Sequence, residues 1–147
     1  MIKQTDKRLN AKINSFGCWF LSHLAMISMN WTAKEVEDVY QLCLKAGAID
    51  ANCTGLKPNE VLAIAAQYKK ESPTKQLGGL VYQPADSWGV KVQDAKVKFI
   101  VVKWTTQNEH FHFTLHVKKG EIYEPFDPVD ATYSLHKMQR VSEQYYG

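Results

Sequence analysis

Residues 14–29 read NSFGCWFLSHLAMISM, and this segment contains the longest apolar stretch of the chain. From position 18 to position 29 apolar side chains occur on nearly every face of a helix, which predicts a helix that is buried on all sides. Gly17 and Ser15 are candidate caps, so Cys18 is expected in the first turn. There the partial positive charge of a helix N-terminus favours a thiolate. A small core residue at the helix start is the structural alternative for this cysteine.

Length and composition predict one ordinary globular domain. The chain has 147 residues, of which 45% are hydrophobic and 22% charged, enough for one core but not for two. The net charge is only +3, and the lysines are scattered, so no nucleic-acid partner is expected. The first ten residues lack the apolar core of a secretion signal, and the apolar run is too short to span a bilayer. We therefore expect no membrane partner, and a protein that is cytoplasmic or released by another route.

Three cysteines, Cys18, Cys43 and Cys53, are present. An odd, low number argues against a disulfide framework, and the absence of a CxxC pair argues against a zinc ribbon. Cys43 lies on the apolar face of a predicted helix, where it is expected to be a core residue. The sequence around Cys53 assigns it no role.

The first half of the chain is predicted to be helical. Thr32 and Glu35 form a capping box at the start of a helix that ends near Gly47. Another helix begins at Pro58, because proline is tolerated in the first turn. The polar segment 69–79, which contains paired glycines, is predicted to be a loop.

The second half is predicted to form strands, at residues 97–104, 110–117 and 122–126, with a last strand or short helix within 133–146. Helices followed by an antiparallel sheet give an α+β domain. We expect a single domain over residues 1–147, with a helical part at about 14–70 and a sheet part at about 80–147.

The strand at 110–117 alternates strictly. His110, His112, Thr114 and His116 share one face, and phenylalanine, leucine and valine side chains share the other. The apolar face is expected to supply core. The histidine face is expected to be either solvated or the wall of a site.

The hairpin that follows this strand favours one histidine. If its loop has two or four residues centred on Lys119 and Gly120, Val117 pairs with Ile122 and His112 lies opposite Asp127. His112 is then the first candidate for a general base and His110 the second, whereas His116 lies too far along the strand.

A carboxylate beside the histidine can fix the tautomer that accepts a thiol proton. Asp127 is the first candidate for this role, and Glu124 and Asp130 are weaker ones. The structural alternative for Asp127 is a turn opener before proline. His110 and His112 with Glu124 or Asp127 could also form a metal site, but barrels that carry such sites need more strands, so no metal or other cofactor is expected.

The chain resembles a family in the order of these segments. A cysteine at a helix start, a His-Phe pair on a strand and a strand ending in Asp-Pro are similar to the papain-like cysteine peptidases. The resemblance is to their small bacterial and phage branch, which includes bacteriocin-processing peptidases that cut after a double-glycine leader. It rests on residues 17–22, 112–115 and 122–128, which cover under a quarter of the chain.

The resemblance implies a papain-like fold, in which a buried central helix starting at the cysteine packs on a C-terminal antiparallel sheet. It implies Cys18 as nucleophile, His112 as base and Asp127 as orienter. That branch carries a glutamine several residues before the cysteine to stabilise the oxyanion. Here Lys12 stands six residues before Cys18, and Asn14 or its neighbour Ser15 is the substitute candidate.

These observations predict a thiol hydrolase that cleaves a peptide or isopeptide bond through an acyl-enzyme. Its expected partner is a peptide or protein substrate. The alternative is a catalytically weak or inactive papain-like domain that binds a peptide or protein. Oligomeric state and substrate identity are not predicted.

Overall fold

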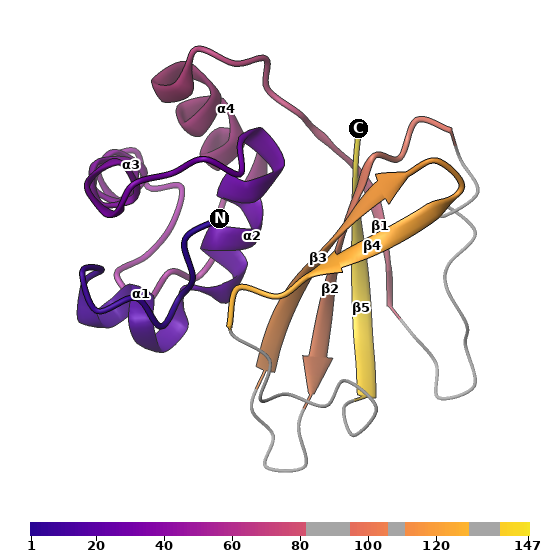
Figure 1. Cartoon of the computed structure of the whole chain (residues 1–147), viewed down its shortest axis with the longest axis horizontal. Coiled ribbons are helices and arrows are strands. Elements are labelled where there is room, and N and C mark those ends of the chain that lie inside the picture. Colours follow the sequence, from indigo (N-terminus) through magenta and orange to yellow (C-terminus); the bar gives the residue numbers. More distant parts are fainter. Residues whose placement is uncertain (82–94, 106–110, 130–138) are drawn as a thin grey trace.

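The computed structural model describes residues 1–81, 95–105, 111–129 and 139–147. In these residues the chain forms four helices and then a five-stranded antiparallel sheet, with the helices gathered on one side of it (Figure 1). This confirms the predicted α+β class. The helices are α1 (Ala11–Phe16), α2 (Cys18–Ile27), α3 (Ala33–Lys45) and α4 (Pro58–Lys69). The strands are β1 (Gln76–Val81), β2 (Phe99–Thr105), β3 (Phe111–Lys119), β4 (Ile122–Phe126) and β5 (Gln139–Tyr146), in the spatial order β1-β5-β2-β3-β4.

Local capping signals place the helix boundaries. The Thr32 hydroxyl accepts from the Glu35 backbone N–H while the Glu35 carboxylate accepts from the Thr32 N–H, which completes the predicted capping box of α3. Pro58 occupies the first turn of α4, as predicted.

The central helix α2 is buried from Cys18 through Met26 and packs against β3 and α4. Gly17 is its N-cap residue and makes no side-chain cap, whereas Ser15 lies inside α1 and does not cap α2. A Cβ at Gly17 would lie 2.5 Å from the Ile13 carbonyl oxygen. The tight last turn of α1, in which the Gly17 N–H donates to the Ile13 carbonyl oxygen, therefore requires glycine at the position before Cys18.

The prediction of a loop over residues 69–79 is wrong for the last part of this range, because β1 begins at Gln76. The strand contains Gly78 and Gly79, and its register with β5 shifts between Gln76 and Gly78. A Cβ on Gly79 would lie 2.9 Å from the Glu143 carbonyl oxygen. The glycines thus mark an irregular strand with a close backbone neighbour, a pattern that resembles a loop in the sequence.

The hairpin register also differs from the prediction. Lys119 pairs with Ile122 and Val117 pairs with Glu124, so the two-residue loop is centred one position later than expected. The pairing is shifted by two residues, and Asp127 is not directly opposite His112. Because the shift is even, each residue keeps its face of the sheet.

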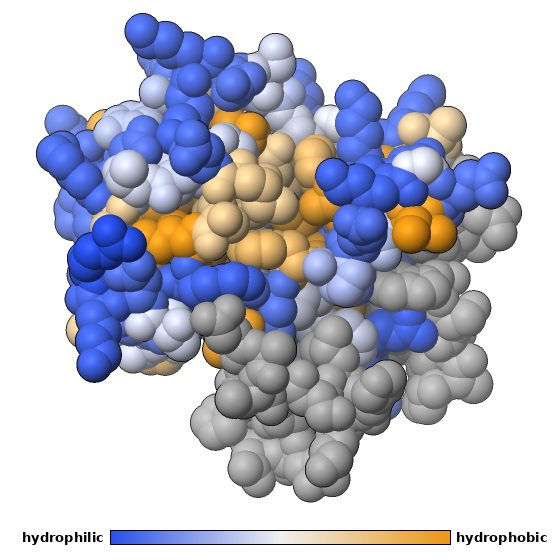
Figure 2. Space-filling view, viewed as in Figure 1, coloured by the Kyte–Doolittle hydropathy of each residue, from blue (hydrophilic) through white to orange (hydrophobic). Residues whose placement is uncertain are grey.

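Both faces of the sheet are covered. Val101, Leu115 and Tyr146 pack with the helices in the main core, while Ile100, Val102, Trp104 and Tyr145 form a second cluster. His112, Thr114 and His116 are buried, which excludes the solvated face, whereas Phe111 on the expected core face is 56% exposed. Apolar side chains also gather on the surface where the helices meet the sheet (Figure 2).

Among the described helices, none has both the length and the apolar character needed to cross a membrane.

Candidate functional site

Cys18 and His112 meet where the first turn of α2 reaches β3. The side chain of Cys18 is within hydrogen-bonding reach of the His112 ring. The two residues stand ninety-four positions apart in the sequence, so the packing of α2 on the sheet brings them together.

Asp127 holds the other side of the same ring. His112 Nε2 donates to Asp127 Oδ1 at 2.8 Å, and the two side chains are 5% and 18% exposed. This contact leaves Nδ1 as the ring nitrogen available to the Cys18 sulfur. The Val129 backbone N–H also donates to Asp127 Oδ1. Asp127 is therefore both a turn former and the partner of the histidine.

The charge state of His112 follows from these contacts. Burial lowers the pKa of His112, but the hydrogen bonds to Asp127 and Cys18, together with their charges, outweigh burial and raise it to about 9. The imidazole is therefore protonated at neutral pH, and a cation stands next to the sulfur.

The N-terminal segment fixes the turn that carries Asp127. Lys3 Nζ donates to the Asp127 carbonyl oxygen at 2.6 Å, and the Gln4 N–H donates to the Pro128 carbonyl oxygen at 2.7 Å. Lys3 Nζ also lies 4.5 Å from the centroid of the Phe126 ring. Neither Lys3 nor Gln4 was predicted from the sequence to contact this turn.

Asn14 is not placed to bind an oxyanion. Its amide nitrogen donates to the carbonyl oxygens of Gln4 and Asp6, so both N–H groups are occupied. Gln4 Nε2 in turn donates to the Asn14 carbonyl oxygen. The expectation for Asn14 is corrected: its side chain anchors the N-terminal segment to α1. Ser15, the other candidate, lines the pocket that contains Cys18.

A pocket of about 590 Å³ opens beside Cys18. Its helical wall contains Phe16 and Trp19 with the loop 52–55, and its sheet wall contains Lys103, Phe111 and Phe113. The nucleophile candidate thus lies at a cleft between the helices and the sheet, with room for a substrate segment.

The other two cysteines differ from Cys18. Cys43 is fully buried in α3, and burial raises its pKa to about 12. Cys53 lines the pocket, but burial, with smaller effects of Asp50 and Cys18, also raises its pKa to about 12. Both thiols are therefore protonated near neutral pH.

Of the remaining sequence candidates, the two that the structure describes, Glu124 and His116, do not join the cluster. His110 and Asp130 lie outside the described residues. Glu124 is exposed and pairs with Val117. His116 Nε2 contacts Thr114 Oγ1 at 3.1 Å, and burial, followed by the charge of Arg140, lowers its pKa to about 4.

The family comparison covers almost the whole chain. A family model described as a protein of unknown function, DUF261, matches residues 1–143. The chain belongs to the DUF261 family. No curated protein and no solved structure matches significantly.

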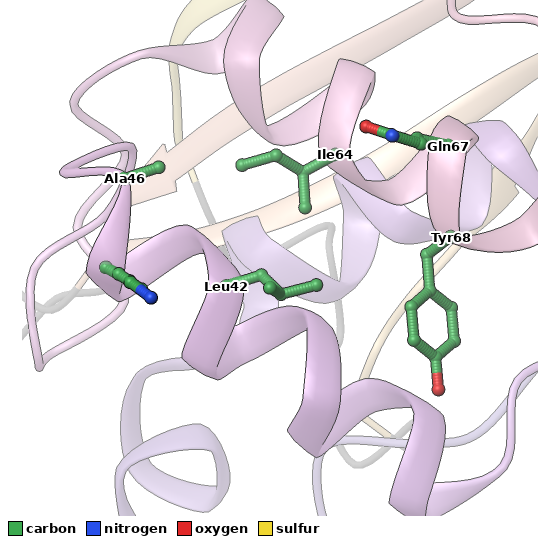
Figure 3. Close-up of a pocket in the computed structure, with 6 residues that line it drawn as sticks. Leu42, Ala46, Ile64, Gln67 and Tyr68 are labelled. Carbon is green, nitrogen blue, oxygen red and sulfur yellow. The ribbon is translucent and has the colours of Figure 1, made fainter.

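A second pocket, of about 460 Å³, lies between α3 and α4 (Figure 3). Leu42 and Ile64 point into it from the two helices, and Tyr68 lines one side. Its lining contains Lys45 but no thiol, histidine or carboxylate. Within the described part of the chain, no cluster of three or more metal-binding side chains occurs either. Of these two pockets, only the one at Cys18 is lined by a thiol.

Proposed function

We propose that this chain is a thiol hydrolase with a papain-like arrangement, acting on a peptide or isopeptide bond. The observation that carries the proposal is the position of His112. Its ring lies between Cys18 and Asp127 and is protonated at neutral pH, beside a pocket that can admit a substrate. A nucleophile, a base and an orienting carboxylate are the three groups that acyl transfer by a thiol requires.

In the first step, the Cys18 sulfur attacks the substrate carbonyl carbon and forms a C–S bond. The imidazolium of His112 gives its proton to the leaving nitrogen, the C–N bond breaks, and the amine departs. Asp127 keeps the ring in place and stabilises its positive charge throughout. The product of this step is a thioester between Cys18 and the acyl part of the substrate.

In the second step, His112 accepts a proton from water, and the hydroxide attacks the thioester carbonyl. The C–S bond breaks and releases the carboxylic acid, and Cys18 is regenerated. We assign the backbone N–H groups of the first turn of α2 and the Ser15 hydroxyl to the oxyanion, because Asn14 is occupied elsewhere.

One observation favours the alternative, a weak or inactive domain of this arrangement that binds a peptide or protein. The nearest upstream glutamine, Gln4, uses its amide N–H on the Asn14 carbonyl oxygen. Loss of one oxyanion donor costs about 10²–10³-fold in rate.

The test is hydrolysis of a fluorescence-quenched peptide library, compared among the wild type, Cys18→Ala and His112→Ala. Glu124→Gln serves as the matched control, because Glu124 is exposed. We expect cleavage by the wild type and the control and only background cleavage by the other two. Cleavage that persists in Cys18→Ala would contradict the proposal, and binding without cleavage by folded wild type would establish the alternative.

A further inference from the structure

The pocket at Cys18 continues into a longer groove. A neighbouring hollow of about 400 Å³ shares Trp19, Gly55, Lys103 and Phe113 with it and extends along the sheet to Gln144. An extended chain could therefore run from the sulfur along the boundary between the helices and β2.

Apolar surface lines the end of this groove nearest the sulfur. Phe16 is 47% exposed and Phe111 is 56% exposed, from the helical wall and the sheet wall respectively. Exposed aromatic rings on both walls of a cleft favour contact with an apolar side chain of a ligand.

One cation faces the groove from the sheet. Lys103 lines both hollows, and its ammonium nitrogen lies 3.9 Å from the centroid of the Phe111 ring and 5.9 Å from that of Phe113. Cation–π contacts of this kind leave ammonium hydrogens available for an anion. No aspartate or glutamate is among the described residues that line either hollow.

Lys103 also shares a pocket with the proposed nucleophile. It lines the same pocket as Cys18, on the face of the sheet that carries Phe113, whereas His112 pairs with the next residue, Trp104, and belongs to the other face. A ligand anion bound by Lys103 would therefore occupy the same pocket as the Cys18 sulfur.

Lys12, which contacts the pocket residue Asn52, differs from Lys103. Lys12 Nζ donates to Asn52 Oδ1 at 2.9 Å. The pKa of Asp50 is lowered mainly by the hydrogen bond from the Thr54 backbone N–H, and the charge of Lys12 adds a smaller contribution. The positive charge of Lys12 is therefore partly balanced by a neighbouring carboxylate, which leaves Lys103 as the stronger determinant.

We infer that the groove selects peptides that carry a carboxylate next to an apolar residue, with Lys103 binding the carboxylate. This inference rests on the proposed function, because it takes the groove as the substrate site. An acidic side chain and a peptide C-terminus are the two sources of such a carboxylate, and both present the same anion to the ammonium group.

The test measures peptide binding by Cys18→Ala protein with isothermal calorimetry. Three acetylated and amidated peptides, acetyl-Gly-Phe-Xaa-Gly-amide, carry Glu, Gln or Lys at the variable position. A fourth peptide, acetyl-Gly-Phe with a free C-terminus, separates a terminal carboxylate from a side-chain one. We expect the Glu peptide or the free acid to bind about 2- to 5-fold more tightly than the Gln peptide.

Variants of Lys103 make the inference falsifiable. Lys103→Met keeps the aliphatic stem over Phe111 and should abolish the preference, and Lys103→Glu should reverse it toward the Lys peptide. Lys45→Met, in the other pocket, should leave it unchanged. Equal affinities for the acidic and neutral peptides, no measurable binding of either acid, or a preference that survives in Lys103→Met would each overturn the inference.

The outcome is separable from that of the proposed function, because Cys18→Ala protein performs no thiol chemistry. Lys103-dependent binding together with no hydrolysis by wild type would leave the inference standing and remove the enzyme proposal. Hydrolysis by wild type with no charge preference in binding would support the enzyme proposal and remove the inference about Lys103.

Discussion

Helices α2 and α3 each have a cysteine and a neighbouring glycine, yet the two pairs have opposite consequences. At α2, Gly17 is required by close packing on Ile13, and it places Cys18 in the first turn beside His112. At α3, Gly47 has a φ of +70° and ends the helix, and a Cβ added there would have no other atom within 4 Å. Cys43 lies on that helix and is fully buried in the protein core. The position of a cysteine and its neighbours, rather than the residue type, therefore determines what it can do.

The largest expected effect comes from removing the charge of Asp127, which holds His112 beside Cys18. Asp127→Asn keeps the shape of the side chain but removes the charge that fixes His112 Nε2. We expect hydrolysis to fall about 10²–10⁴-fold, as for orienting carboxylates elsewhere. Initial rates with the best library peptide measure this, and Cys43→Ala should change them little. Equal losses in the two variants would remove the distinction between the two cysteines.

The next effect is on the free energy of unfolding, when Gly17 or Gly47 is replaced by alanine. In Gly17→Ala the added methyl group would meet a backbone oxygen that cannot move freely, so we expect a loss of about 3 kcal/mol in the free energy of unfolding. Gly47→Ala meets no atoms but must keep a left-handed conformation, which costs about 1–2 kcal/mol. Urea unfolding of both variants measures the difference. The explanation for Gly17 fails if its variant is no less stable than that of Gly47.

The α2 helix also carries a buried histidine, unlike α3. His23 Nδ1 donates to the Trp19 carbonyl oxygen and Nε2 accepts from the Tyr146 hydroxyl, and burial lowers its pKa to about 3. The unfolded chain binds a proton near pH 6.5, so stability is lost as pH falls below that value. The slope is at most about 1.4 kcal/mol per pH unit for this group. Unfolding curves from pH 7 to 4 should show a smaller slope in His23→Phe, and an unchanged slope would contradict the assignment.

The last expected effect is a loss of folding stability at alkaline pH, where His112 gives up its proton. Its pKa is raised in the folded state to about 9, so its stabilisation is complete below pH 6.5 and is lost as pH rises through 9. We expect a contribution of at most about 3 kcal/mol, visible as a pH dependence of unfolding that Asp127→Asn weakens. An unchanged pH dependence in that variant would show that Asp127 does not hold the proton on His112.

The sequence predicted α2, α3 and α4 well because their signals are local, whereas the short helix α1 was not predicted. The Thr32–Glu35 capping box and Pro58 each act within one turn, and the apolar run after Gly17 identified the buried helix. Pairing between strands was harder. The hairpin loop lies one position later than predicted, and only the even size of the resulting shift kept His112 and Asp127 on compatible sides.

Contacts between residues that are far apart in the sequence were not predictable. The bonds from Lys3 and Gln4 to the Asp127–Pro128 turn join segments 124 residues apart, and no local pattern marks them. The sequence left the burial of Thr114 and His116 open, since alternation alone does not show that both faces of a sheet are covered.

The most direct test of the central claim is alkylation by iodoacetamide, followed residue by residue with mass spectrometry at pH 7. The contact between Cys18 and His112 predicts that Cys18 is modified much faster than Cys43 and Cys53, and that His112→Ala slows only Cys18. Equal, slow modification of all three cysteines in the folded protein, or a fast Cys18 that does not respond to the loss of His112, would contradict it.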